Sequence, residues 1–150
     1  MTIRACVEED LPQVVELVGE LAEAVGDAAP PDRATVSRHF RAMARRPGVY
    51  GNLVADEEGV VLGLVSFVHY RSFLHRTGTT LVNELVVRSG LRGGGVGGAL
   101  LDAVVEEARR LDMDEVEVGV QRSNGGALHF YRERGFDAEY TLLGMELGDE

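Results

Sequence analysis

The chain has a single cysteine and no long apolar run, and each shortage excludes a class of protein. Cys6 alone cannot form an internal disulfide or a cysteine-based zinc site, so we expect it to be a small core residue. No apolar run is long enough to span a membrane, and the N-terminus lacks a basic segment followed by an apolar one. These absences predict a cytoplasmic protein without membrane contacts.

Basic side chains are also scarce, because 15 Lys and Arg residues stand against 25 Asp and Glu residues and leave a net charge of −10. A nucleic-acid-binding surface needs a basic stripe, so nucleic acid is excluded as a partner. The negative surplus would attract a cationic amine over long range, or would simply keep the protein in solution. No spacing of His, Asp and Glu resembles a metal-ligand set, and we therefore expect no metal.

What the chain does have is the size and composition of one folded domain over residues 1–150. A chain of this length buries roughly 70% of its unfolded surface on folding, which is enough for a hydrophobic core. Its 45% hydrophobic and 27% charged residues are ordinary values for a globular protein. No repeat, linker or low-complexity tract divides it, so we expect a single domain.

Hydrophobic periodicity predicts the order of helices and strands. Helices are expected over residues 11–25, 33–46, 96–111 and 126–134, and strands over 2–7, 50–56, 60–70, 79–87, 115–120 and 136–147. Asp10 is expected to cap the first helix, and loops are expected over 26–32 and 71–78. This order predicts a mixed α/β (α+β) fold, in which one central mixed sheet is flanked by helices on both faces.

A glycine-rich segment follows the strand that ends at Val87 and opens the next helix at once. Glycines at the start of a helix leave backbone N–H groups bare at the positive end of the helix dipole. Such an end binds phosphate or pyrophosphate readily. The segment therefore predicts a site for an anionic cofactor.

Two common classes of glycine loop fit this segment poorly. A P-loop needs Lys-Ser or Lys-Thr after its last glycine, where this chain has Ala99-Leu100. A dinucleotide fingerprint is formally present at Gly93, Gly95 and Gly98. The next strand, however, ends in Gln121 instead of an acidic residue, and too few residues follow to complete a doubly wound sheet.

A third pattern, R-x-x-G-x-G at Arg92, Gly95 and Gly97, is followed at the right separation by N-x-x-A-x-x-F-Y-x-x-x-G-F over residues 124–136. Together these motifs resemble the GNAT superfamily of N-acetyltransferases, and the resemblance extends loosely to residues 1–12. It implies an acyl-CoA N-acyltransferase fold. It also implies transfer of an acetyl group from acetyl-CoA to a primary amine of a small molecule or peptide, by direct attack of the amine on the thioester.

The resemblance further implies where acetyl-CoA would lie, between the strands at 79–87 and 115–120. The backbone of one strand would pair with the pantetheine arm, the glycine loop would hold the pyrophosphate, and an N–H at or beside Val87 would polarise the thioester carbonyl. Asn124 matches the asparagine of the family that contacts the cofactor, and it also suits a helix cap. The expected cofactor-binding residues are Leu85, Val86, Val87, Arg92, Gly93, Gly94, Gly95, Val96, Gly97, Gly98, Asn124 and Tyr131.

Tyr131 and Glu84 are the expected catalytic residues. Tyr131 matches the tyrosine of the family that returns a proton to the CoA thiolate. Glu84 is an ionisable group on an apolar strand, expected to share a face with Val82 and Val86, and we predict that it is the general base. Some relatives place that base where this chain has Gly119. Weaker candidates for the base are Glu117, His69, His75 and His129.

Two other functions remain compatible with the sequence: a non-catalytic acyl-CoA-binding regulatory domain and a nucleotide-binding oxidoreductase. The acceptor amine is not readable, because the residues expected to contact it, over 26–46 and 71–78, match no known pattern. Antibiotics, polyamines, amino acids and protein N-termini all stay open as acceptors. A homodimer is equally compatible with these features.

Overall fold

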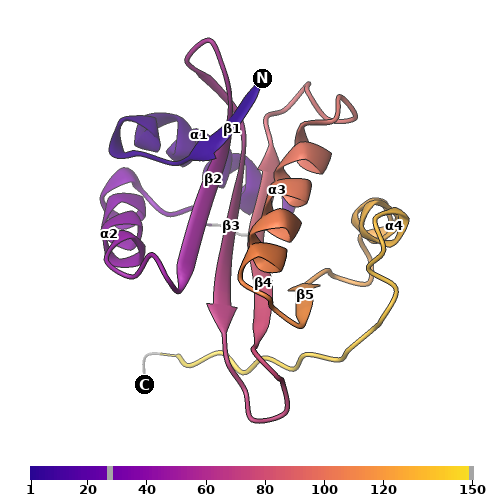
Figure 1. Ribbon diagram of the computed structural model, residues 1–150. Helices are drawn as coiled ribbons and strands as arrows, with labels where there is room; N and C mark the ends of the chain where they lie inside the picture. The colour runs from indigo at the N-terminus through magenta and orange to yellow at the C-terminus, as the bar shows by residue number, and fades with distance from the viewer. Residues whose placement is uncertain (27–28, 149–150) are drawn as a thin grey trace.

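A five-stranded sheet organises the part of the chain that the computed structural model describes, residues 1–26 and 29–148 (Figure 1). Its strands are β1 (Thr2–Ala5), β2 (Tyr50–Glu57), β3 (Val60–Tyr70), β4 (Thr79–Val87) and β5 (Glu115–Val118). The helices are α1 (Leu11–Ala24), α2 (Arg33–Ala44), α3 (Val96–Arg110) and α4 (Gly125–Glu133), and a short 3-10 turn covers Glu8–Asp10. The predicted loop over 26–32 falls partly on residues 27–28, which lie outside the described residues.

The strands follow one another in the sheet in the order β1-β2-β3-β4-β5. Neighbours from β1 to β4 are antiparallel, whereas β4 and β5 are parallel and are joined through α3. Helices α1 and α2 pack on one face of the sheet and α3 packs on the other, as Figure 1 shows. The predicted mixed sheet with helices on both faces is confirmed.

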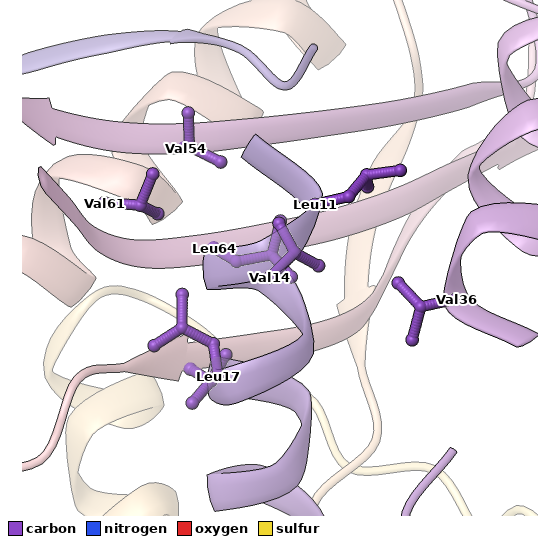
Figure 2. Close-up of a cluster of buried hydrophobic side chains, with 8 residues drawn as sticks. Leu11, Val14, Leu17, Val36, Val54, Val61 and Leu64 are labelled. Carbon is purple, nitrogen blue, oxygen red and sulfur yellow. The ribbon is translucent and has the colours of Figure 1, made fainter. Parts of the chain in front are cut away.

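Two hydrophobic clusters fix the helices on the sheet. Figure 2 shows the first, in which apolar residues at helical spacing on α1 meet Val36 of α2 and the strands. Its members are Leu11, Val14, Leu17, Val36, Val54, Val61, Leu64 and Val86. The second cluster, under α3, contains Ala55, Val65, Phe67, Val82, Val96, Leu100, Leu101 and Val104. Each fully buried aliphatic side chain contributes about 2 kcal/mol to the stability of the fold.

The first helix is anchored differently from the prediction. The carboxylate of Asp10 does not cap α1. It accepts hydrogen bonds from the Arg4 guanidinium at 2.8 and 2.9 Å and from the Val7 N–H at 2.8 Å. Asp10 is buried, and these partners hold its pKa below the usual range because they stabilise the charged form. A buried carboxylate needs such partners, which explains the difference.

Cys6 packs against the first cluster, as expected of a small core residue, and burial raises the pKa of its thiol to about 12. The thiol is therefore protonated at neutral pH and a poor nucleophile. In residues 1–26 and 29–148, no helix combines the length and the apolar content needed to cross a membrane.

The predicted β segment over residues 136–147 is wrong. These residues pair with no strand, and beyond Asp137 their main-chain groups make no hydrogen bond within the described chain. The period of two in the sequence is present, but the path of the chain carries the segment away from the sheet edge (Figure 1). Sequence periodicity detects a suitable side-chain pattern and cannot detect a missing partner strand.

Candidate active site

The strands β4 and β5 separate partway along their length. They pair from Thr79 opposite Glu115 to Val82 opposite Val118, and β5 ends there. Beyond that point β4 continues to Val87 along β3, with no strand among the described residues on its other side. The β5-facing edge of β4 over residues 83–87 therefore offers backbone donors and acceptors to a ligand.

A β-bulge marks the point of separation. Ser66 of β3 pairs with Glu84 and the next residue, Phe67, pairs with Val82, so Asn83 is the extra residue on β4. A bulge bends its strand and increases the local twist, which turns β4 away from β5. The opening is thus built into the pairing register of β4.

The bulge also changes which side chains share a face. Val86 lies in the first cluster, under α1 and α2, whereas Val82 lies in the second cluster, under α3. Glu84 is two residues before Val86 and lies within electrostatic reach of His39 on α2. It therefore faces α1 and α2, so the prediction that it shares a face with Val86 is correct. The prediction that it also shares a face with Val82 is wrong, because Asn83 interrupts the alternation.

The glycine loop presents bare amides at the start of α3. Gly93 and Gly95 have φ of 85° and 88°, a left-handed conformation that side chains other than glycine rarely adopt. The first helical hydrogen bond runs from the Ala99 N–H to the Gly95 carbonyl at 3.0 Å. Among the described residues, nothing accepts from the N–H groups of residues 95–98, so four donors point out of the positive end of the helix.

A cation that the sequence reasoning missed lies beside the first turn of α3. A Cβ built on Gly98 would come within 2.0 Å of a guanidinium nitrogen of Arg134, so a side chain at residue 98 would push that guanidinium aside. Arg134 bonds Asp102 at 3.1 Å and stacks at 5.1 Å from the centre of the Phe130 ring. No sequence signal joins residues 98 and 134, because the contact depends on how α4 packs against α3.

The two arginines that flank the loop differ in availability. Arg92 is exposed and forms no ion pair in the described structure, so it is free to meet an anion. Arg88 instead donates to Glu16 of α1 at 2.8 Å and to the Val61 carbonyl at 3.0 Å. Arg88 is therefore occupied in fixing α1 to the sheet.

Tyr131 lies on α4 beside the second cluster. Its ring makes edge contacts with Phe130 and Phe136, at centroid distances of 5.1 and 5.5 Å. Its hydroxyl has no hydrogen-bond partner among the described residues, and burial raises the pKa of the phenol to about 12. The side chain is therefore a protonated donor with an unused O–H.

Asn124 caps α4, because its side-chain oxygen accepts from the Ala127 N–H at 3.1 Å. Its side-chain amide N–H₂ keeps its donors for another partner. Gly119 lies just past the end of β5, where an added Cβ would meet nothing within 4 Å. Glu117 accepts a hydrogen bond from the Tyr70 hydroxyl at 2.6 Å and is therefore engaged elsewhere on the sheet.

The surroundings of Glu84 suit a base. Its side chain reaches solvent, yet protein atoms enclose enough of it that burial raises the pKa of the carboxyl. His39 of α2 is the nearby group that opposes this rise. Sequence reasoning missed His39, because only the docking of α2 brings it toward β4.

None of the three histidines considered as alternative bases joins Glu84. His69 contacts the Thr80 hydroxyl at 2.8 Å, and burial lowers the pKa of its ring. His75 bonds Ser72 within the loop after β3. His129 is exposed on α4, 3.9 Å from Glu133. In the described chain, no group of three or more His, Cys, Asp and Glu residues is arranged to hold a metal ion.

This arrangement has recognisable relatives. The model of the acetyltransferase (GNAT) family matches residues 13–136. The chain is 31% identical to an L-methionine sulfoximine/L-methionine sulfone acetyltransferase of Pseudomonas paraeruginosa, over 98% of this chain and 87% of that protein. It is 32% identical to an L-amino acid N-acyltransferase of Escherichia coli, over 70% of this chain and 62% of that protein.

A solved structure agrees on the fold. The crystal structure of a transcriptional regulator from Bacillus halodurans superposes with a TM-score of 0.85 at 21% identity, over 97% of this chain and 99% of that chain. The family match spans most of the sequence and includes both motifs, so the resemblance inferred from them is confirmed. The chain therefore belongs to the GNAT family of acetyltransferases and is an acetyl-CoA-dependent N-acetyltransferase.

Proposed function

We propose that acetyl-CoA lies in the opening between β4 and β5, with its pyrophosphate on the first turn of α3. The observation that carries this proposal is the set of unpaired N–H groups of residues 95–98 at the start of α3. Backbone amides at a helix start bind phosphate groups, and the Arg134 guanidinium beside Gly98 adds positive charge near them. Arg92 and the conformations of Gly93 and Gly95 support the same placement.

The unpaired edge of β4 is proposed to hold the rest of the molecule. The pantetheine arm contains two amides, and the backbone of Leu85 to Val87 would pair with them as a strand would. The side chains of Leu85 and Val87 pack in the second cluster, so their role is structural, and only their backbone is assigned to the ligand. An N–H at or beside Val87 would polarise the thioester carbonyl and stabilise the oxyanion that forms on it.

Acetyl-CoA supplies an activated acyl group, and the chain supplies the proton transfers. The amine nitrogen attacks the thioester carbon, the carbon–sulfur bond breaks, and an amide is formed. Glu84 accepts the proton that the amine loses, directly or through water. Tyr131 gives a proton to the leaving thiolate, and its unbonded, protonated hydroxyl supports this role.

The position of Glu84 supports separate entrances for the two substrates. The base faces α1 and α2, whereas Tyr131 lies on α4 and Arg134 directly follows it, near α3. The amine would approach from the α1/α2 face and the cofactor from the α3/α4 side. The two reactants would then meet at the β4 bulge, where the strand alone separates the two faces.

For the acceptor we propose an α-amino acid or a close analogue such as methionine sulfoximine. Two relatives at about 30% identity act on such compounds, as their names state. The negative surplus of the chain favours the approach of a protonated amine, and Glu84 would then accept its proton at the site.

The test is a thiol-release assay with acetyl-CoA and a panel of amino acids, methionine sulfoximine, a polyamine and an aminoglycoside. We expect product formation, verified by intact mass, with the amino-acid group and not with the polycations. The matched control is Tyr131→Phe, which should bind CoA normally and release little thiol. CoA binding by the parent without turnover of any amine would instead favour a non-catalytic binding domain.

A further inference from the structure

Three polar side chains interrupt the apolar face of the sheet that α1 and α2 cover. Asn52 of β2, Ser66 of β3 and Glu84 of β4 follow one another in register, because Asn52 pairs with Ser66 and Ser66 pairs with Glu84. We call these three residues the polar row. Neighbouring strands lie about 4.8 Å apart, so the row crosses about 10 Å of the sheet from Glu84 to Asn52.

The side chains of the polar row all lie on the same face. Both sequence neighbours of Ser66 belong to the second cluster, under α3, so Ser66 itself faces α1 and α2. The Asn52 side chain faces the same way, because its amide N–H donates to the Met43 sulfur of α2 at 3.9 Å. Glu84 shares this face with Val86 of the first cluster. The row therefore lies beneath the helices from which the amine is proposed to approach.

The polar row has unused hydrogen-bonding capacity. Ser66 is buried, with 4% of its surface exposed, and its hydroxyl forms no hydrogen bond with the described residues. Thr79 has the one unpartnered side-chain oxygen that the described chain encloses completely, so the Ser66 hydroxyl still reaches open space. The Met43 sulfur is a weak acceptor and leaves the Asn52 amide largely unused. Buried polar groups normally have strong partners, so this row has donors and acceptors to offer a ligand.

The row ends at a cavity on the side away from Glu84. Asn52 lines this cavity, of about 390 Å³, together with Phe40 and Met43 of α2 and Tyr50 of β2. Small-molecule sites have volumes of this order, with apolar walls and a few polar groups that fix the orientation of the ligand. Apolar side chains beside the Asn52 amide suit a ligand chain that is apolar along its length and polar near its end.

We propose that Asn52 and Ser66 determine acceptor specificity, by binding the polar end of the acceptor's side chain while its amino group meets Glu84. This inference rests on the proposed function, because it takes Glu84 as the base and an amino acid as the acceptor. In methionine sulfoximine three carbon atoms separate the amino nitrogen from the sulfur, a length comparable to one strand spacing. The Ser66 hydroxyl and the Asn52 amide supply donors for the oxygen and nitrogen on that sulfur.

This arrangement favours a polar side chain over an apolar one of the same length. Methionine has the same carbon skeleton as its sulfoximine but lacks the two acceptor atoms on sulfur. Bound at this site, it would displace water from the Ser66 hydroxyl and the Asn52 amide and leave both without a strong partner. Each neutral hydrogen bond lost in this way corresponds to roughly a fivefold loss of affinity.

The test compares kcat/KM for methionine sulfoximine with kcat/KM for methionine, at saturating acetyl-CoA. The parent should prefer the sulfoximine. Asn52→Leu and Ser66→Ala should each reduce this preference roughly fivefold, mainly through KM, because the lost contact binds substrate and transition state alike. Thr80→Val is the matched control, since it removes a buried hydroxyl of β4 that contacts His69 at 2.8 Å, away from the row. Its preference should equal that of the parent.

Asn52→Asp gives a result that misfolding cannot imitate. A carboxylate at residue 52 should favour a cationic side chain, so arginine should gain kcat/KM relative to methionine sulfoximine. A parent without the preference, an Asn52 or Ser66 variant that keeps the parent's preference, or no gain for arginine would overturn the inference and leave the proposed acceptor class in place. Absence of turnover with every amino acid would overturn the proposed acceptor and this inference together.

Discussion

The two edges of β4 differ along the same nine residues. Toward β3 the strand is paired from Thr79 to Val87, whereas toward β5 it is paired only as far as Val82. The fully paired edge holds the sheet together and is covered by both hydrophobic clusters. The half-paired edge lies beside Tyr131, Arg134 and the bare amides of α3. One edge of β4 thus stabilises the sheet, and the other edge is available to the proposed ligand.

The largest effect is expected on turnover, when the hydroxyl of Tyr131 at the half-paired edge is removed. Tyr131→Phe keeps the ring contacts with Phe130 and Phe136 and removes the hydroxyl that would protonate the thiolate. Turnover should fall by roughly one to three orders of magnitude, while CoA binding stays within error. Steady-state kinetics and calorimetry on one preparation measure both, and unchanged turnover would show that water or another group protonates the sulfur.

A matched pair of alanine substitutions compares how much the fully paired and the half-paired sides of β4 contribute to the free energy of unfolding. A Cβ on Gly63 of β3 would lie 2.9 Å from the Val86 carbonyl oxygen and 3.0 Å from Leu100, in the paired and packed region. Gly63→Ala should lower the free energy of unfolding by about 2 kcal/mol, because the neighbours cannot yield without strain. Gly119→Ala, which meets nothing within 4 Å past the end of β5, should change stability much less. Urea unfolding measures both variants, and equal losses of unfolding free energy would contradict the assignment of stability to the fully paired edge.

Substitution in the glycine loop should weaken CoA binding, and a branched residue at the left-handed φ of Gly95 should also lower stability. Gly95→Val places a branched side chain at a φ of 88° beside the four bare amides, and CoA affinity should fall at least tenfold, about 1.4 kcal/mol. Arg134→Gln should weaken CoA binding by a smaller factor, since the amides remain. Calorimetry measures both, and a folded Gly95→Val variant with parental affinity would remove the loop from the site.

The smallest effect is expected from Glu84→Gln, and its size should depend on pH. Burial raises the pKa of Glu84, so its base form is present only above that raised value and is lost as the pH falls through it. Glu84→Gln should cost most just above that pKa, where the acceptor amine is largely protonated, and should recover toward high pH as free amine becomes abundant. The measurement is the pH profile of kcat/KM, and superimposable profiles would make Glu84 structural.

Much of the fold was predictable because local patterns decide it. The strands β2, β3 and β4 and the helices α1 and α3 lie within a residue or two of the predicted ranges, since their apolar periodicity matches the face they bury. The glycine loop and the segment at 124–136 were identified from fixed spacings, and the family match agrees with them.

The parts that the sequence did not predict all depend on contacts distant in the chain. The bulge at Asn83 is a matter of pairing register with β3, and it reversed the expected relation between Glu84 and Val82. Arg134 over Gly98 and His39 near Glu84 follow from helix docking. Residues 136–147 do not form a strand because no other strand pairs with them, although their side-chain pattern is that of a strand.

The placement of acetyl-CoA along the open edge of β4 is tested most directly by amide hydrogen exchange with and without CoA. The account predicts slower exchange on CoA addition for residues 95–98 and for at least one amide among Leu85 to Val87. Exchange in β2, remote from the opening, should stay unchanged. Protection of the loop without any change in Leu85 to Val87, or no protection at either place in a protein that binds CoA, would contradict it.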